Sequence, residues 1–328
     1  QGHLFHPQPI FYPRQGEDRN KKMDTTLYKK VGIATLGIAR DLILSNVGDK
    51  CPTIAECTEK FGVSRGTIQE AFAILESSGS VVTEKRGKKG AIIQSKDDQL
   101  LYQYAQLDAI TASMPTPLNQ YLMGLATAIC RSMSKTTVPF TFAFIQGAYN
   151  RVKALRKNKY DMVITSYMTA KNFLAEYSEL EIAMTLNECL YSKEYVIVVN
   201  SPNVTSLKDG MTFGFDPTCS DQLAIINKLS CDYDLKLIKV PYGSSRFALA
   251  NHTVDAIVYR REQWLERFAS QITILPAKGY KAEMDMPVIL VNKQNYGMDR
   301  LIRSFLDEKE CAQIQNAVID GSMEMQLY

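Results

Sequence analysis

PTIAECTEKFGVSRGTIQEAFAILESSGSVVTEKRGKKGAII, residues 52–93, is the stretch that decides the fold of the N-terminal part of the chain. Thr53 can cap a helix, and Glu56 stands three residues further on, at the spacing of a capping box. Gly62 suits the left-handed conformation that ends a helix, and Ser64 can cap a second helix immediately afterwards. The stretch therefore predicts two helices joined by a tight turn.

The second helix, expected over residues 65–77, has one apolar and one polar face. Its apolar side chains recur at helical spacing, at Ile68, Ala71, Phe72 and Leu75. The opposite face carries Arg65, Thr67, Gln69 and Glu70. A helix-turn-helix presents the N-terminal part of its second helix to the major groove, and these residue types suit phosphate and base-edge contacts. The pattern predicts a DNA-binding unit.

A basic hairpin follows the two helices. Short apolar runs at 81–83 and 91–93 predict two strands, and the seven residues between them include Lys85, Arg86, Gly87, Lys88, Lys89 and Gly90. An isolated run of Lys and Arg is more often a solvated turn. Because this run directly follows a helix-turn-helix pattern, we expect the hairpin to contact phosphates as a wing.

Residues 64–79 (SRGTIQEAFAILESSG) and 84–93 (EKRGKKGAII) resemble the winged-helix domain of GntR-type bacterial repressors. The resemblance implies that Ser64, Arg65, Thr67, Gly87, Lys88 and Gly90 face DNA. Where that family often has arginine, this chain has Gln69, which can read adenine in a bidentate manner. The full set of expected DNA-contacting residues is Ser64, Arg65, Thr67, Gln69, Lys85, Arg86, Gly87, Lys88, Lys89 and Gly90.

Length and composition indicate an ordinary globular protein of roughly two domains, given 328 residues with 45% hydrophobic and 22% charged side chains. The formal net charge is only +3, so affinity for nucleic acid would have to be local. No apolar run reaches the roughly 20 residues that span a bilayer, so no membrane partner is expected. Seven dispersed cysteines without a CxxC pair fit reduced thiols in a cytoplasmic protein.

The expected domain organisation has three parts. Residues 1–22 are interpreted as a tag scar, Gln1-Gly2-His3, and a flexible tail, with a native start at Met23 or earlier. Residues 23–98 form the winged helix-turn-helix domain, and residues 107–328 form a second domain. In that domain apolar strands alternate with helices, which favours an α/β fold with mainly parallel pairing. The last helix is expected to run without a break over residues 298–319.

A weak internal repeat refines the second domain. Gly147 is followed by a short helix, Asp161 and an apolar strand, and Gly243 is followed by a short helix, Asp255 and another apolar strand. This unit resembles the helix-Asp-strand element of type 2 periplasmic-binding-protein folds. The resemblance implies two lobes with a ligand cleft between them, lobe one over about 107–198 and 286–328 and lobe two over about 200–284. The hinge is then expected near Asn200 and Met284.

The combination of the two domains is similar to the YhfZ family of transcriptional regulators. The segment ASMPTPLNQYLMGLATAI, residues 112–129, and the terminal MEMQLY carry this resemblance. It covers nearly the whole chain after Met23 and does not identify the effector.

Ligands of open α/β lobes bind outside the carboxyl ends of strands, near helix N-termini. That rule selects Ser113, Met114, Thr116, Gln146, Gly147, Thr165, Ser166, Asp216, Thr218, Ser220, Tyr242, Ser244, Ser245, Tyr259 and Arg260. For any single residue of this set, helix capping or a surface loop is the simpler role. Hydroxyl-lined helix N-termini and Arg260 together favour a small polar effector, and an anionic one in particular.

Catalytic, metal and cofactor sites are not expected. Of three histidines, only His252 lies in the folded region, in a polar turn, so neither a Ser-His-Asp triad nor a histidine-bound metal is favoured. No P-loop or dinucleotide fingerprint occurs. The sequence thus predicts a regulator, not an enzyme, with double-stranded DNA and a small effector as partners. The alternatives are a small-molecule-binding protein or enzyme on the two-lobed domain, with a winged helix that binds protein.

A homodimer is expected, because one winged helix reads only a few base pairs and a two-fold partner extends the reading. Candidate contacts lie in the aromatic-rich tail, at Phe5, Phe11 and Tyr12, and on the apolar first helix, at Ile33, Leu36, Ile38, Leu42 and Ile43.

Overall fold

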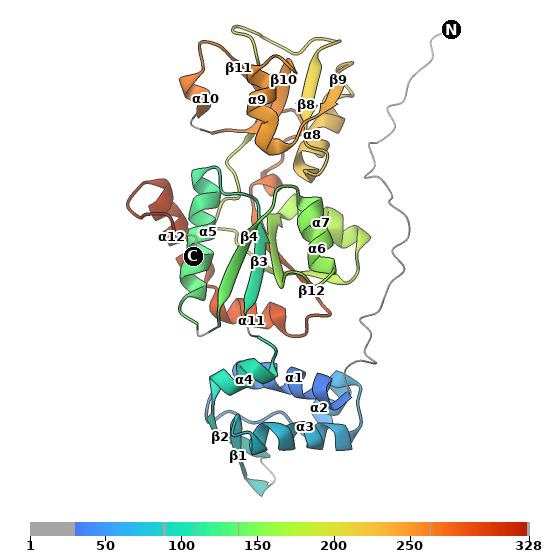
Figure 1. Cartoon of the computed structure of the whole chain (residues 1–328), viewed down its shortest axis with the longest axis vertical. Coiled ribbons are helices and arrows are strands. Elements are labelled where there is room, and N and C mark those ends of the chain that lie inside the picture. The colour runs from blue at the N-terminus through green and yellow to red at the C-terminus, as the bar shows by residue number, and fades with distance from the viewer. Residues whose placement is uncertain (1–29, 88–89, 108, 137, 263, 327–328) are drawn as a thin grey trace, which may run out of the picture.

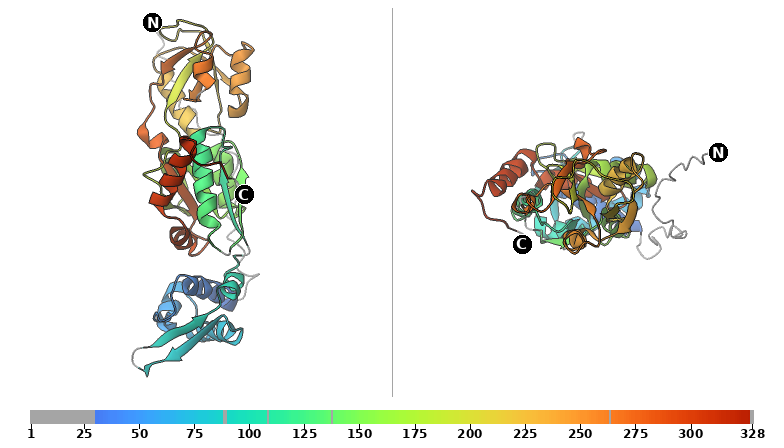
Figure 2. Two further views of the ribbon diagram at one scale, coloured as in Figure 1. Left: turned by 90° about the vertical axis from the view of Figure 1, so that its left-hand side faces the viewer. Right: turned by 90° about the horizontal axis from the view of Figure 1, so that it is seen from above.

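The computed structural model describes residues 30–87, 90–107, 109–136, 138–262 and 264–326. Three bodies are stacked along the long axis of the molecule (Figure 1), and the side view in Figure 2 shows the same order. A winged helix-turn-helix domain lies at one end, lobe one in the middle and lobe two at the other end. The expected tail and Lys88 and Lys89 of the wing lie outside the described residues.

The winged helix-turn-helix domain is built as its local sequence signals predict. Its elements are α1 Lys30–Ile43, α2 Ile54–Phe61, α3 Arg65–Ser77, β1 Val81–Lys85, β2 Ala91–Lys96 and α4 Asp98–Tyr104. The capping box is confirmed, since Thr53 Oγ1 accepts from the Glu56 amide at 3.2 Å and Glu56 Oε2 accepts from the Thr53 amide at 2.7 Å. Gly62 has a φ of 63°, and Ser64 Oγ accepts from the Thr67 amide. The helix-turn-helix and its antiparallel hairpin follow from these caps and turns.

This domain extends beyond the boundary expected at residue 98. Helix α4 packs against α1, and Leu101 and Ala105 are fully buried in the same core as Ile38 and Leu75. The Asp97 side chain caps α4 by accepting from the Leu100 amide at 3.1 Å. Seven residues are too few to display a helical period, which is why the sequence pattern did not reveal this helix.

Lobe one is a five-stranded sheet between two helical layers. Its elements are β3 Ile110–Met114, α5 Gln120–Met133, β4 Phe140–Phe144, α6 Ala148–Arg156, β5 Met162–Ser166, α7 Tyr167–Glu176, β6 Leu180–Thr185, β12 Pro287–Asn292, α11 Met298–Phe305 and α12 Glu308–Ile319. The strand order is β4-β3-β5-β12-β6. Helices α5 and α12 share one core with α11, and α6 and α7 cover the other face.

Lobe two is a second five-stranded sheet with the order β11-β7-β10-β8-β9. Its elements are β7 Tyr195–Val199, β8 Thr212–Phe215, α8 Ser220–Leu229, β9 Lys236–Lys239, η2 Tyr242–Ser244, α9 Ser245–Ala250, β10 Ala256–Arg260, α10 Trp264–Arg267, β11 Thr273–Pro276 and η3 Ala282–Met284. Helix α8 packs on one face, and α9 and α10 on the other. The overall class, a helix-turn-helix domain followed by a two-lobed α/β domain, is confirmed.

Three expectations within this class are corrected. Pairing is mixed, not mainly parallel, because β12 is antiparallel to β5 and β6, and β7 is antiparallel to β10 and β11. The lobe boundary near Asn200 is wrong, since β7 belongs to the sheet of lobe two and the chain crosses before it. The helix expected over 298–319 is two helices, because Asp307 caps a new one by accepting from the Glu310 amide at 2.8 Å.

The repeated aspartates have matching roles in the two lobes. Asp161 Oδ2 accepts from the amide of Thr111 at 2.8 Å and from its hydroxyl at 2.9 Å. Asp255 Oδ2 accepts from the amide and hydroxyl of Thr212, both at 2.7 Å. Each aspartate thus fastens the start of its own strand to the start of the neighbouring one, which explains the repeat noted in the sequence.

The two chain crossings between the lobes run side by side and form the hinge. The Tyr191 amide donates to the Asp285 carbonyl at 2.6 Å, and Ser192 Oγ donates to Asp285 Oδ1 at 2.5 Å. Tyr280 also donates its hydroxyl to the Asp285 carboxylate. The hinge therefore lies at residues 191–192 and 285, close to the expected Met284 but earlier than the expected Asn200.

Candidate functional site

The elements that carry the predicted DNA-contacting residues, α3 and the β1–β2 hairpin, lie at the free end of the winged helix domain, away from lobe one (Figure 1). Exposed members of the set are Ser64, Arg65, Gln69, Lys85, Arg86 and Gly87. Thr67 and Gly90 are half-buried, and the Thr67 and Ser64 hydroxyls share a hydrogen bond of 2.9 Å. The N-terminus of α3 and the described part of the wing are thus both accessible to a partner.

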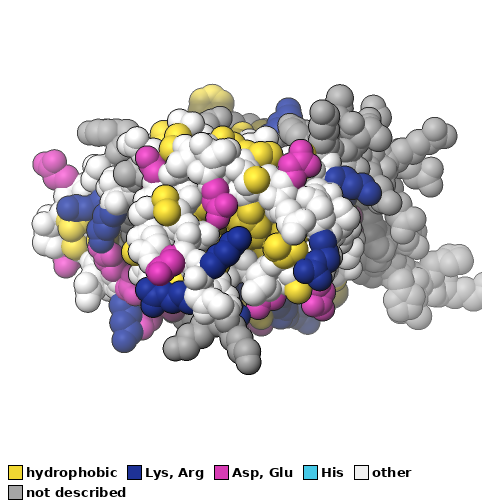
Figure 3. All heavy atoms as spheres, turned by 90° about the horizontal axis from the view of Figure 1, so that it is seen from below, with side chains coloured by type: hydrophobic (Ala, Val, Ile, Leu, Met, Phe, Trp, Pro, Cys, Tyr) yellow, Lys and Arg dark blue, Asp and Glu magenta, His cyan; other side chains and the backbone are white. Residues whose placement is uncertain are grey.

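The charge of this surface is mixed. Figure 3, a view of this end, shows Lys and Arg side chains interspersed with Asp and Glu and with apolar side chains. On the wing, Arg86 Nη2 lies 3.0 Å from Glu84 Oε2. Both side chains are about half exposed, so the pair is weak and Arg86 can exchange Glu84 for a phosphate at small cost.

The second candidate site is a cavity between the lobes. Seven of the predicted ligand residues line it, namely Thr116, Gln146, Gly147, Thr165, Asp216, Tyr242 and Arg260. They come from the ends of strands in both lobes and from the helix starts that follow. The cavity measures about 30 Å³, which is room for about two water molecules. The lobes are therefore closed on one another.

The other predicted ligand residues do not line this cavity. They are Ser113, Met114, Ser166, Thr218, Ser220, Ser244, Ser245 and Tyr259. Ser113 is buried in β3 and donates to the Ala143 carbonyl at 3.0 Å, and Ser245 donates to the Pro241 carbonyl. Tyr259 stacks on Tyr242 with ring centroids 4.9 Å apart. Ser113, Ser245 and Tyr259 are thus used within their own lobe, and for the strand residues Ser113 and Tyr259 the reason is that a strand points alternate residues to opposite faces.

Sequence reasoning missed six polar residues of the lining, namely Asn119, Arg151, Thr169, Tyr191, Asp221 and Glu262. Arg151 faces inward from α6, four residues after Gly147, and only its helical spacing from that glycine could have indicated it. Tyr191 lies in the hinge, and Asp221 lies in the first turn of α8. No local motif marks them.

Two buried arginines are the main feature of the cavity. Arg151 donates from Nη1 to the Ile145 carbonyl at 2.9 Å and from Nη2 to Tyr191 Oη at 3.2 Å, while its Nε has no partner. The Arg260 guanidinium lies 4.6 Å from the ring centroid of Tyr191 and donates from Nε to Tyr195 Oη at 3.3 Å. Tyr191 of the hinge therefore contacts both guanidinium groups.

Neither arginine forms an ion pair with any carboxylate in the part of the chain that the structure describes. Their relative exposures are only 2% for Arg151 and 6% for Arg260. A buried cation without a counter-ion is costly, so the arrangement favours a negatively charged group placed between the lobes.

Asp221 connects the lobes across the cavity. It is buried in lobe two, and its Oδ1 accepts from Ser166 Oγ and from Thr169 Oγ1 of lobe one, both at 2.9 Å. Burial raises the pKa of the Asp221 carboxyl. Beside it, Gly147 approaches so closely that an added Cβ would lie 2.1 Å from Thr218 Oγ1 of lobe two. These contacts hold the lobes in the closed arrangement.

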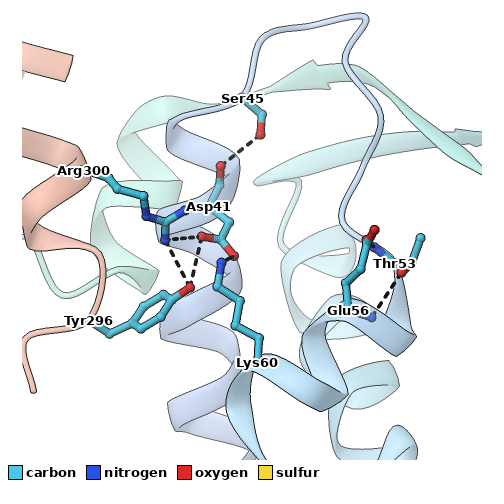
Figure 4. Close-up of polar contacts among 7 residues, drawn as sticks. All are labelled: Asp41, Ser45, Thr53, Glu56, Lys60, Tyr296 and Arg300. Atoms are coloured by element: carbon cyan, nitrogen blue, oxygen red, sulfur yellow. Dashed lines mark hydrogen bonds and ion pairs between the residues drawn. The ribbon is translucent and has the colours of Figure 1, made fainter. Parts of the chain in front are cut away.

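The winged helix domain is joined to lobe one through Asp41 of α1 (Figure 4). Asp41 Oδ2 lies 2.7 Å from Lys60 Nζ of α2, and Asp41 Oδ1 lies 2.6 Å from Arg300 Nη2 of α11. Tyr296 Oη donates to the same oxygen at 3.3 Å, and its ring packs edge-on against Phe61. We call this group of contacts, with those of Arg40, the joint.

Arg40 completes the joint from the neighbouring position of α1. Its Nη1 donates to Asn295 Oδ1 at 2.6 Å and to the Tyr296 carbonyl, and its Nε donates to the Ala105 carbonyl at 3.1 Å. Asn295 in turn donates to Asp161 Oδ1 at 2.9 Å. Burial lowers the pKa of Arg40 to about 10, where it is still a cation at neutral pH. The joint thus connects α1 to the strands of lobe one.

Two negative observations concern the described residues only. No group of three or more His, Cys, Asp or Glu side chains among them is placed to hold a metal ion. In the same part of the chain, no helix is both long and apolar enough to cross a bilayer.

The fold and these surfaces define a DNA-binding transcriptional regulator, in which a helix-turn-helix domain is joined to a periplasmic-binding-protein-like domain. A model of the helix-turn-helix domain matches residues 46–93. The chain belongs to the YhfZ family, because the model of the YhfZ C-terminal domain matches residues 97–326. The narrower GntR-type assignment of the winged helix stays a prediction.

Two relatives are similar to this chain over different shares of its length. The YhfZ protein of Escherichia coli is 26% identical over 304 residues, which cover 92% of this chain and 99% of that protein. The Uxu operon regulator of Haemophilus influenzae is 27% identical over 153 residues, covering 46% of this chain and 54% of that regulator.

Solved structures show the same fold. YhfZ from Shigella flexneri superposes with a TM-score of 0.56 at 23% identity, covering 70% of this chain and 97% of the other. An ancestral arginine-binding protein bound to arginine superposes with a TM-score of 0.51 at 15% identity, covering 66% of this chain and 99% of the other. At these identities the similarity concerns the architecture of the two lobes.

Proposed function

We propose that this regulator binds its operator with an affinity that depends on a small polar effector held between the two lobes. The observation that supports the proposal is the pair of buried arginines, Arg151 in lobe one and Arg260 in lobe two, without carboxylate partners at the interlobe cavity. An effector that supplies a negative group would compensate both. Because the two arginines come from different lobes, it would favour the closed arrangement.

A continuous path leads from the cavity to the DNA-binding domain. Strand β12 starts two residues after Asp285 of the hinge, and the joint follows its end at Asn295 and Tyr296. Its six residues span about 20 Å at the usual rise of a strand. A change of hinge angle is thus transmitted through one strand to the segment that contacts Arg40 and Asp41.

The size of the regulatory effect depends on how differently the effector binds the open and closed states. DNA and effector must change each other's affinity by the same factor, and coupling energies of about 1–3 kcal/mol are typical. A regulator with these parts acts where the chromosome is, so we expect it in the cytoplasm. We also expect it to work as a homodimer on a two-fold symmetric site.

The dimer contacts expected on α1 need correction. Ile38 and Leu42 are fully buried within the chain, where they pack in the core of the winged helix domain, and α1 faces lobe one through Arg40 and Asp41. Ile33, Leu36 and Ile43 are only half-buried, so these three stay candidate contacts of the proposed dimer, and the expected aromatic contacts of the tail lie outside the described residues.

The proposal is tested by a thermal-shift screen of metabolites on the full chain, followed by operator binding with each hit. We expect a hit to raise the melting temperature and to change operator affinity, and Arg260→Ala to abolish both effects. A hit that stabilises the protein yet leaves operator affinity unchanged would contradict the regulatory role. Sedimentation at micromolar concentration tests the dimer.

A further inference from the structure

Three unpartnered polar atoms meet at the interlobe cavity. Among the described residues, the buried side-chain atoms without a hydrogen-bond partner are Arg151 Nε, Tyr242 Oη and Glu262 Oε1, and all three residues line this cavity. Buried polar atoms without partners are rare and costly, so their convergence points to a ligand that completes them. Arg151 offers a donor and Glu262 an acceptor, and therefore the ligand must bring both an acceptor and a donor.

The charges of the lining decide what kind of molecule this is. The cavity is lined by two guanidinium groups, Arg151 and Arg260, and three carboxylates, Asp216, Asp221 and Glu262, which give a formal net charge of −1. A bare anion would add to this negative charge in a closed space. A bare cation would leave both arginines without a counter-ion. A molecule with separate positive and negative groups and no net charge avoids both costs.

The three carboxylates are not equivalent. Asp216 accepts from the amide and hydroxyl of Thr218 and from the Tyr242 amide, and Asp221 accepts from two hydroxyls of lobe one. Glu262 Oε2 accepts from Trp264 Nε1 at 3.0 Å, whereas its Oε1 has no hydrogen-bond partner among the described residues, so Oε1 is the carboxylate oxygen that is left for a ligand.

We infer that the effector is a zwitterion, with a carboxylate bound by Arg151 and Arg260 and an ammonium group bound by Glu262. The inference rests on the proposed effector site and specifies the chemical class that the site takes. α-Amino acids are the simplest members of this class, because their two charged groups lie on one carbon.

A larger side chain on that carbon has space outside the inner cavity. A neighbouring groove of about 510 Å³ shares Leu118, Asn119 and Glu262 with the cavity lining and continues past Arg246 and Trp264. The zwitterionic end is therefore assigned to the inner cavity, which must widen to hold it, and the remainder of the molecule is assigned to the groove. Because the inner cavity is closed and small, the lobes must open to admit either part.

The test uses the full chain and sets of matched probes. The twenty standard amino acids are compared with their 2-hydroxy acids, which lack the ammonium group, and with their decarboxylated amines. We expect at least one amino acid to raise the melting temperature and to bind in calorimetry. The affinity for each of its two matched analogues should be at least about tenfold lower.

Variants identify the group responsible. Glu262→Gln keeps the shape of the side chain but removes its charge. It should lower the affinity for the amino acid about tenfold or more, and it should reduce the difference in affinity between the amino acid and its 2-hydroxy acid. Glu188→Gln is the matched control, since Glu188 is exposed and lines neither the inner cavity nor the groove. It should bind like the unaltered protein.

The outcomes separate the two proposals. The inference of a zwitterionic effector is wrong if 2-hydroxy acids bind as tightly as amino acids, or if no amino acid binds. In that case a metabolite of another class that binds the unaltered protein but not Arg260→Ala would still support the effector site. If an amino acid binds as expected but operator affinity does not respond, the ligand class stands and the regulatory function fails.

Discussion

Asp41 in the winged helix domain and Arg300 in lobe one form an ion pair of 2.6 Å, although 259 residues separate them in the sequence. The same carboxylate also lies 2.7 Å from Nζ of Lys60, on helix α2, which directly precedes α3, the helix expected to read DNA. One side chain therefore contacts both the effector-binding domain and the helix-turn-helix. Asp41 is therefore the residue that most directly connects the effector-binding domain with the helix-turn-helix.

Removing the Asp41 charge should weaken the connection. Asp41 is buried, but its partners are more than a third exposed, so we expect Asp41→Asn to cost about 1–2 kcal/mol of stability. Operator affinity should become less responsive to the effector. Urea unfolding and operator titrations with and without effector measure these effects. Glu59→Gln, an exposed change on α2, is the control and should alter neither.

Substitutions on the DNA-binding surface should separate recognition from charge. Gln69→Ala should relax the base preference at one operator position, at a cost of about 1–3 kcal/mol for the preferred base. Lys85→Ala should weaken binding to all sequences and lower the log–log salt slope by about 0.9, as should each of Lys88 and Lys89. Binding isotherms at several salt concentrations distinguish the two effects. Lys239→Ala, exposed in lobe two, should leave the slope unchanged, and an unchanged slope in Lys85→Ala would contradict the wing assignment.

Gly147→Ala should prevent closure of the cleft. The added methyl group would lie 2.1 Å from Thr218 Oγ1, and the φ of +81° is unfavourable for alanine. We expect loss of effector binding and a larger radius of gyration in small-angle scattering, with operator binding in the absence of effector retained. Gly243→Ala is the matched control, because nothing lies within 4 Å of its added Cβ. Normal effector affinity in Gly147→Ala would show that closure does not depend on this contact.

The buried carboxylate of Asp221 should make stability depend on pH. Burial raises its pKa in the folded protein above that of the unfolded chain. The contribution of Asp221 to the stability of the folded protein is therefore most favourable below the pKa that it has in the unfolded chain. This contribution is lost as the pH rises through the pKa that it has in the folded protein. Asp221→Asn removes the titrating group and keeps an acceptor for Ser166 and Thr169. Its melting temperature should exceed that of the unaltered protein at neutral pH, and the difference should shrink near pH 4. Asp234→Asn, an exposed change, should show no such trend.

The parts of the fold that local sequence determines could be predicted. The capping box of Thr53 and Glu56 and the turn at Gly62 depend on residues within a few positions of one another. Asp161 and Asp255 were visible as a repeat because each directly precedes its own apolar strand, although their partners Thr111 and Thr212 lie 50 and 43 positions away.

The remaining features depend on partners that are distant in sequence. Strand β7 is uniformly apolar, so nothing in it shows which sheet it joins. Arg151 and Glu262 lie more than a hundred positions apart and become a site only when the lobes close. For the same reason, residues chosen by the strand-end rule, such as Ser113, could not be separated from those that reach the cavity.

The joint is built from α1, from Lys60 and Phe61 at the end of α2, and from lobe one, whereas the recognition helix and wing lie on the opposite side of the domain (Figure 1). Among the described residues, the contacts of the joint involve none of residues 64–87 and not Gly90, so exchanging this stretch for that of another winged helix would leave the side chains of the joint in place. Engineers could use such grafts to direct the same metabolite response to a different promoter, and a biosensor made in this way would keep its dose–response curve while changing its output gene.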